Sequence, residues 1–205
     1  AARASIARDY PAVEFMGVEG TFEEALPLLA SLQPKLIFFL GSTIGNLTEN
    51  ECEPFWSQVT GSMAEGDHFL LGVDLVKDPS VLAAAYNDAA GVTARFTKNL
   101  FVRMNRELDT SIDLDAVQHE ARWSPERERI ETHAAFLERQ TIELDGRRFE
   151  IEAGERVLVE ISRKFRIETL SRELERFGLH RIDTFTDERD WFALLLLRRG
   201  APGPG

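Results

Sequence analysis

Two continuous apolar runs flank a segment with helical periodicity in the first half of the chain. Residues 36–40 read Leu-Ile-Phe-Phe-Leu and residues 69–73 read Phe-Leu-Leu-Gly-Val, with no polar alternation. Such runs are typical of parallel strands that are buried on both faces. Between them, apolar residues recur at helical spacing over residues 54–64, so we expect a helix there, ended by Gly66. The order strand, helix, strand predicts a parallel crossover in an α/β sheet.

The segments on either side of the first run carry weaker signals. Residues 1–8 and 21–32 have helical spacing, and residues 13–18 form a short apolar run that predicts a weak strand. After the second run, a short helix is expected from Asp78 to Gly91. A further helix is expected from Thr93, which could cap it.

Alternating patterns replace helical ones beyond residue 110. Residues 141–144 and 147–151 flank Asp145-Gly146, a strong signal for a β-hairpin, and residues 156–162 predict another strand. We therefore expect a β-rich insert in an α/β fold.

The last part of the chain returns to the core pattern. Residues 167–177 predict an amphipathic helix, and residues 179–186 and 191–198 predict two strands that are close enough to pair antiparallel. Residues 200–205 consist of Gly, Ala and Pro, and we expect a disordered tail.

Composition removes several classes of function. The chain has 24 Lys and Arg against 35 Asp and Glu, a net charge of −11, which argues against a nucleic-acid surface or a basic membrane-binding face. The longest apolar run is too short to span a membrane. Cys52 is the single cysteine, so no intrachain disulfide and no zinc-type Cys/His cluster is expected. We expect a cytoplasmic protein without a metal.

Candidate chemistry begins at the carboxyl end of the first strand, where open α/β sheets bind ligands. The sequence there is Gly41-Ser42-Thr43-Ile44-Gly45-Asn46, in which glycines permit close approach of a ligand to the backbone. The segment is neither a GxGxxG nor a Walker A motif. Spacing alone fits an ordinary strand-to-helix loop equally well.

Four further polar residues could face a ligand. Asp74 follows the second strand, where we favour capping of the next helix over ligand contact. Tyr86 fits helix packing, although its hydroxyl would need a partner if buried. Glu160 and Ser162 share one face of a strand and could hold a planar ring through two nitrogens, but the pattern alone favours an exposed edge.

Taken together, these residues resemble the histidine-specific, S-adenosylmethionine-dependent methyltransferases, which make trimethylhistidine (hercynine) in ergothioneine biosynthesis. Several blocks carry the resemblance in the family's order: FFLGSTIGNLT (38–48), LGVDLVKD (71–78), AYNDAAGVTA (85–94), NREL (105–108), GE (154–155) and EISRKF (160–165).

The resemblance implies a role for each substrate-binding residue. Asn46 and Tyr86 would hold the α-amino and carboxylate groups of L-histidine, and Glu160 and Ser162 would hydrogen-bond its imidazole. Thr132 falls where relatives can carry methionine beside the ring.

The resemblance also implies a site for S-adenosyl-L-methionine. Gly41, Ser42 and Thr43 would border this methyl donor. Phe22 would lie beside its adenine, and Thr21 stands where relatives place an aspartate.

The implied fold is the carboxyl-terminal part of a class I methyltransferase, a Rossmann-like α/β sheet with an antiparallel final strand pair and a β-rich substrate-binding insert. We expect residues 1–98 to form a partial methyltransferase core and residues 99–165 to form the substrate-binding insert. Residues 166–199 would return to the core, and residues 200–205 would form a disordered tail. The family's first strands and Gly-rich loop would precede Ala1. The complete enzyme is expected to act as a monomer on a small molecule.

Other functions remain possible from the residues. A non-catalytic amino-acid-binding remnant would keep the substrate residues without the donor site. A methyltransferase for another amino acid or a histidine derivative would fit the threonine at position 132. A nucleotide-dependent oxidoreductase is disfavoured by the missing GxGxxG motif and the antiparallel final hairpin.

Overall fold

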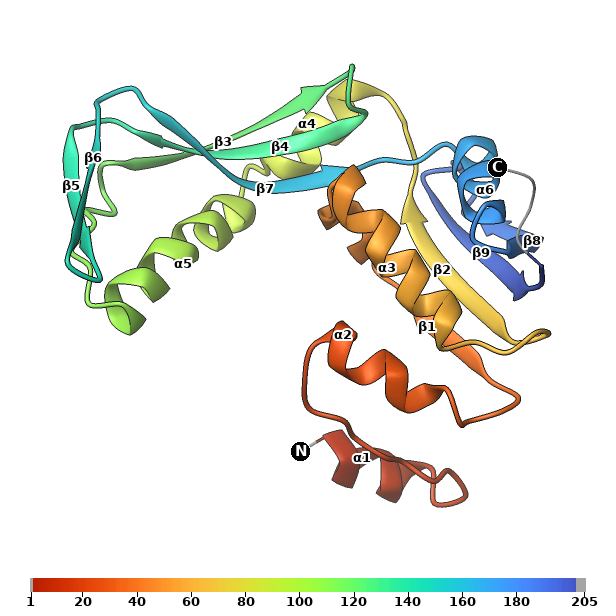
Figure 1. Ribbon diagram of the computed structural model, residues 1–205. Coiled ribbons are helices and arrows are strands. Elements are labelled where there is room, and N and C mark those ends of the chain that lie inside the picture. Colours follow the sequence, from red (N-terminus) through yellow and green to blue (C-terminus); the bar gives the residue numbers. More distant parts are fainter. Residues whose placement is uncertain (1, 202–205) are drawn as a thin grey trace.

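A four-stranded sheet forms the core of the protein. The computed structural model describes residues 2–201 (Figure 1). Strand order is β1-β2-β9-β8, with bounds Leu36–Phe39, His68–Asp74, Phe192–Arg199 and Leu179–Thr186. β1 and β2 are parallel, whereas β2–β9 and β9–β8 are antiparallel. The predicted crossover and final hairpin are both confirmed, and the fold is a mixed α/β fold.

Two helices, α3 (Glu49–Gly61) and α6 (Ile167–Glu175), cover one face of this sheet (Figure 1). Trp56 and Leu174 are buried against alternate residues of β2 and β9, such as Leu71 and Leu195. Burial of these side chains removes apolar surface from water and provides the main stabilisation of the core.

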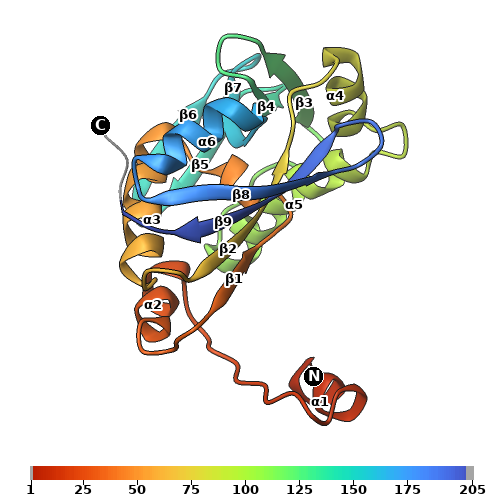
Figure 2. The same ribbon diagram turned by 90° about the vertical axis from the view of Figure 1, so that its right-hand side faces the viewer.

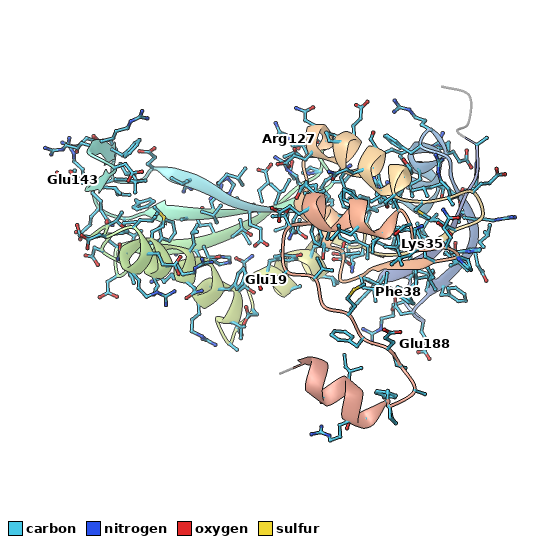
Figure 3. All side chains as sticks on the ribbon, turned by 60° about the horizontal axis from the view of Figure 1, so that its bottom comes forward. Glu19, Lys35, Phe38, Arg127, Glu143 and Glu188 are labelled. Atoms are coloured by element: carbon cyan, nitrogen blue, oxygen red, sulfur yellow. The ribbon has the colours of Figure 1, made fainter. Side chains whose placement is uncertain are left out.

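The opposite face of β1 departs from our expectation of burial on both sides. Ile37 and Phe39 pack into the core, while Leu36 and Phe38 are 45% and 59% exposed (Figure 3). In the described part of the chain, both covering helices lie on one side of the sheet. An unbroken apolar run therefore does not distinguish one-sided from two-sided burial.

Several helix boundaries differ from the predicted ones. α3 begins at Glu49, before the expected start, because Thr48 and Glu51 form a reciprocal capping box. It ends at Gly61 rather than at Gly66. Residues 13–18 form no strand.

The helix expected over residues 21–32 is shorter than predicted. It consists of α2 (Phe22–Ala25), followed by the 3₁₀ helix η1 (Leu26–Leu29). Pro27 has no N–H to donate in an α-helical ladder, which explains the change.

A second, β-rich layer adjoins the core. β3 (Val117–Ser124), β4 (Arg129–Phe136) and β7 (Arg156–Arg163) form an antiparallel sheet in the order β3-β4-β7. The hairpin of β5 (Gln140–Leu144) and β6 (Arg147–Ile151) turns at Asp145-Gly146, as predicted. Both turn residues have positive φ, which is the signature of a type I′ turn.

Two helices pack against this second sheet (Figure 1). They are α4 (Pro79–Tyr86) and α5 (Val92–Glu107). Helix α5 continues without a break across residues 98 and 99, where we expected the partial core to end and the insert to begin. Thr93 does not cap α5, contrary to our expectation. Instead, the Asp88 carboxylate accepts hydrogen bonds from the first backbone N–H groups of the helix, following Gly91 in the left-handed conformation. At the other end of the chain, α1 (Ala2–Asp9) lies apart from the sheets (Figure 2).

The four-stranded sheet and the β3-β4-β7 sheet meet where β2 and β7 end. Leu75 and Phe165 form an isolated parallel bridge, and the N–H of Phe165 donates to the carbonyl of Asp74 at 2.9 Å. The 3₁₀ helix η2 (Thr43–Asn46), which follows β1, packs against β7 at the same place. The carboxyl ends of β1, β2 and β7 are thereby brought together.

Candidate active site

The loop after β1 is held in a tight turn by its own side chains. Gly41 and Ser42 both have positive φ, 76° and 57°. The Ser42 hydroxyl accepts a hydrogen bond from the N–H of Asp74 at 3.0 Å, and the Thr43 hydroxyl donates to the carbonyl of Leu40 at 3.1 Å. These bonds fix the loop to the ends of β1 and β2.

Gly45 allows this loop to approach β7 closely. A Cβ atom at this position would lie 2.9 Å from the carbonyl oxygen and 3.2 Å from the nitrogen of Arg163. Backbone atoms of a sheet cannot move away easily, so a glycine is required there. The contact places Asn46 beside the end of β7.

A polar cavity of about 480 Å³ lies at this junction. Its volume is in the range of small-molecule sites. Its lining comes from the loop after β1, the ends of β2 and α4, β7 and β9: Gly41, Ser42, Asn46, Asp74, Tyr86, Glu160, Ser162 and Phe192. Of the ten residues to which the family resemblance gave a role, six thus surround one space.

Tyr86 is held in place from β3. The His119 ring contacts the Tyr86 carbonyl through Nε2 and the Thr97 hydroxyl through Nδ1, both at 2.9 Å. Asn87 exchanges hydrogen bonds with the backbone of Ala121. These contacts fix the end of α4 and direct the Tyr86 ring toward β7.

Lys164 connects the polar groups of the cavity, a role that we did not expect from the sequence. Its side chain is fully buried. Nζ donates to Asp74 Oδ2 at 2.9 Å, to Tyr86 Oη at 2.8 Å and to Ser162 Oγ at 2.8 Å. The Tyr86 hydroxyl in turn donates to Ser162 Oγ at 2.7 Å. The sequence EISRKF does not indicate that its lysine is buried, because the burial of this side chain depends on how β7 packs against β2 and α4.

Asp74 does not cap the following helix, contrary to our expectation. Asp78 does so, with its carboxylate accepting from the N–H of Ser80. The Asp74 carboxylate instead pairs with Lys77 through one oxygen and with Lys164 through the other. The negative charge of Asp74 between the two lysines compensates the burial of their ammonium groups.

Glu160 is a half-buried polar group of the cavity whose carboxylate is left without a hydrogen-bond partner in the described part of the chain. Burial raises the pKa of this carboxyl above its ordinary 4.5, and the charge of Lys164 partly opposes the shift. A ligand that donates an N–H would satisfy it.

A second hollow of about 280 Å³ lies on the other side of Glu160, between α5 and β7. Its lining is mainly apolar and includes Phe96, Leu100 and Val159. Phe96 and Leu100 lie on α5, and their side chains are 66% and 43% exposed. Both side chains are therefore accessible from this hollow rather than packed in a core.

Four candidate residues do not line the polar cavity. Thr132 is buried on β4 and pairs with Glu160 across the strands. Thr21 caps α2, and Phe22 packs edge-on against Phe39 at 5.3 Å, beside a separate hollow. Thr43 uses its hydroxyl within its own loop.

Within the described residues, the acidic, histidine and cysteine side chains form no group of three that could bind a metal ion. Over the same part of the chain, none of the helices combines the length and apolar character needed to cross a membrane.

Residues 1–199 match the family described as histidine-specific methyltransferase, SAM-dependent. The chain belongs to this family. It is 44% identical over 194 residues to the histidine N-alpha-methyltransferase of Mycobacterium tuberculosis, covering 94% of this chain and 60% of the relative. The corresponding protein of Mycolicibacterium smegmatis is 42% identical over 200 residues, covering 97% and 62%.

A third relative is more distant. The ergothioneine biosynthesis protein 1 of Neurospora crassa is 33% identical over 94 residues, covering 44% of this chain and 11% of the relative. The chain therefore spans about three fifths of the length of the two bacterial histidine methyltransferases and a small part of the fungal protein.

Proposed function

We propose that this protein transfers methyl groups from S-adenosylmethionine to the α-amino nitrogen of L-histidine, forming trimethylhistidine for ergothioneine biosynthesis. One observation carries the proposal: in a member of this methyltransferase family, Glu160 and Ser162 line one cavity together with Asn46 and Tyr86. The names of the relatives agree with this substrate and this pathway.

Glu160 and Ser162 are suited to recognise an imidazole ring through hydrogen bonds. Their side chains offer a carboxylate and a hydroxyl on the same face of β7, matching the two nitrogens of the ring. The apolar hollow of Phe96, Leu100 and Val159 adjoins Glu160 and could contact the faces of the ring. A phenyl ring has no N–H, so it would leave the half-buried carboxylate unpaired and should be rejected.

Asn46 and Tyr86 are suited to hold the other end of the amino acid. The Asn46 amide carries both donors and an acceptor, and it makes no hydrogen bond with the described residues. The Tyr86 oxygen keeps one lone pair after its bonds with Lys164 and Ser162. Holding both ends of histidine would align the amino nitrogen for attack.

The loop after β1 fits a methyl donor through its backbone rather than its side chains. The Ser42 and Thr43 hydroxyls are used within the protein, whereas Gly41 leaves its backbone open to the cavity. When bound, S-adenosylmethionine supplies a methyl group on a positively charged sulfur, which is already activated for transfer. We assign Gly41, Ser42 and Thr43 to this donor, and Thr21 and Phe22 to its adenine side.

The amino nitrogen must lose a proton before each transfer. Asp74 lines the cavity, but both of its oxygens are paired with lysines, so it is poorly placed to accept that proton. We therefore assign proton transfer to water held by the polar lining, and we assign no residue the role of a general base.

The proposal extends to the organisation of the enzyme. We propose that the described sheet is part of a class I, Rossmann-like methyltransferase core, with residues 99–165 as the substrate-binding insert. We further propose that the complete enzyme is cytoplasmic and acts as a monomer. Thr132, directly opposite Glu160, would border the ring and influence how tightly it fits.

The test is to incubate the full-length gene product with S-adenosylmethionine and L-histidine and to analyse the products by mass spectrometry. We expect mono-, di- and trimethylated histidine, and no product from L-phenylalanine. Histidine binding without methylation would support the amino-acid-binding alternative. Methylation of another amino acid in preference to histidine would contradict the proposed substrate.

A further inference from the structure

Lys164 is a buried charge to which the proposed reaction assigns no contact with substrate. Burying an ammonium group is unfavourable unless each of its donors finds a partner. Its three N–H groups have three acceptors within 2.9 Å: Asp74 Oδ2, Tyr86 Oη and Ser162 Oγ. The ammonium also lies 4.8 Å from the centre of the Tyr86 ring, a favourable cation–π distance.

These bonds determine the direction in which the two hydroxyl groups can act. Ser162 Oγ accepts from Lys164 and also from the Tyr86 hydroxyl, so both of its lone pairs are used. Its own proton must then point elsewhere, and Ser162 lines the cavity. Tyr86 has donated its proton to Ser162 and keeps only a lone pair. Toward the cavity, Ser162 therefore presents a hydrogen-bond donor and Tyr86 presents an acceptor.

We propose that Lys164 is a positioning residue that makes Ser162 a hydrogen-bond donor toward the substrate ring. The inference rests on the proposed function. With Ser162 donating and the Glu160 carboxylate accepting, the site matches a ring that has one nitrogen lone pair and one N–H. That ring is neutral imidazole. The imidazolium ion has two N–H groups and no lone pair. One of its N–H groups would therefore face the Ser162 O–H, and neither group could accept the other's proton.

Lys77 provides a matched control in the same network. It pairs with the other oxygen of Asp74 and lies over the Trp191 ring, but it makes no hydrogen bond to Tyr86 or Ser162. Replacing it removes a positive charge near the cavity without changing the hydroxyl groups. A purely electrostatic role for Lys164 would therefore be shared by Lys77, whereas a positioning role would not.

The experiment is a double-mutant cycle on the full-length gene product, with L-histidine affinity measured by calorimetric titration. Lys164→Met should weaken histidine binding by about tenfold or more, and Lys77→Met by less than about twofold. In a Tyr86→Phe/Ser162→Ala background, Lys164→Met should cost less than about twofold more. Thermal midpoints of all variants show whether each is folded.

The outcomes separate this inference from the proposed function. If the wild-type protein neither binds nor methylates histidine, the proposed function is wrong. If the wild type does both and the effects of the substitutions are additive, only the role of Lys164 is wrong. If Lys164→Met does not fold, Lys164→Gln, which keeps an amide donor, takes its place in the cycle. Failure of both to fold would show a structural requirement and reject the positioning role.

Discussion

Removing the Glu160 carboxylate should weaken histidine binding more than any other single change to the ring-binding face. The carboxylate is half-buried, lines both the polar cavity and the apolar hollow, and has no hydrogen-bond partner in the described chain. A hydrogen bond to a charged group contributes about 1.5–3 kcal/mol. Glu160→Ala should therefore weaken histidine binding by about 2 kcal/mol or more, roughly 30-fold in Kd.

The assay is calorimetric titration of the full-length gene product with L-histidine at neutral pH. Glu160→Gln retains the shape and one acceptor oxygen, so it should bind with an affinity between those of wild type and Glu160→Ala. Glu143→Ala is the control, because Glu143 is an exposed strand residue on the distal hairpin (Figure 3). Unchanged histidine affinity in a folded Glu160→Ala variant would refute the role of this carboxylate.

The stability of the same variants gives an independent check. Burial raises the pKa of Glu160 above its ordinary 4.5, so the ionised carboxylate is less favourable in the folded protein than in the unfolded chain. Above this raised pKa, ionisation lowers stability, and below the ordinary pKa the effect disappears. Glu160→Gln should thus be slightly more stable than wild type at pH 7, with the difference lost as the pH falls below about 4.5. A destabilised Glu160→Gln variant at pH 7 would indicate a structural role for the carboxylate.

Three further predictions concern the surroundings of the site. Gly45→Ala should lower stability by about 1–3 kcal/mol in chemical denaturation, because its Cβ would press on the Arg163 backbone; Gly61→Ala, with open space around it, should not. Asp88, whose pKa is lowered to about 2 by backbone hydrogen bonds at the start of α5, stabilises the fold when ionised. Its contribution should be lost as the pH falls from about 4 to 2, so thermal melts of wild type and Asp88→Ala should converge over that range. Asn46→Ala should weaken histidine binding by about 1 kcal/mol, roughly fivefold, and an unchanged titration would remove it from the site.

The features that could be predicted from the sequence depend on neighbours along the chain. The hairpin at Asp145-Gly146 follows from turn residues that tolerate positive φ, and the strand His68–Asp74 follows from its apolar run. The amphipathic helix α6 follows from apolar residues at helical spacing. Errors arose where a local signal had competitors, as at Thr93, where the carboxylate of Asp88 caps the helix instead.

The sequence by itself determined the α/β character, the parallel crossover, the final antiparallel hairpin and membership of a methyltransferase family, because periodicity, turn chemistry and shared motifs are all written along the chain. Only the tertiary structure decided that Lys164 is buried between Asp74, Tyr86 and Ser162, and that Asp74 holds two lysines rather than a helix. Lys164 is separated from Asp74 and Tyr86 by about eighty residues or more. Such contacts depend on how β2, α4 and β7 pack, and on the need of a buried charge for partners, which no local pattern records.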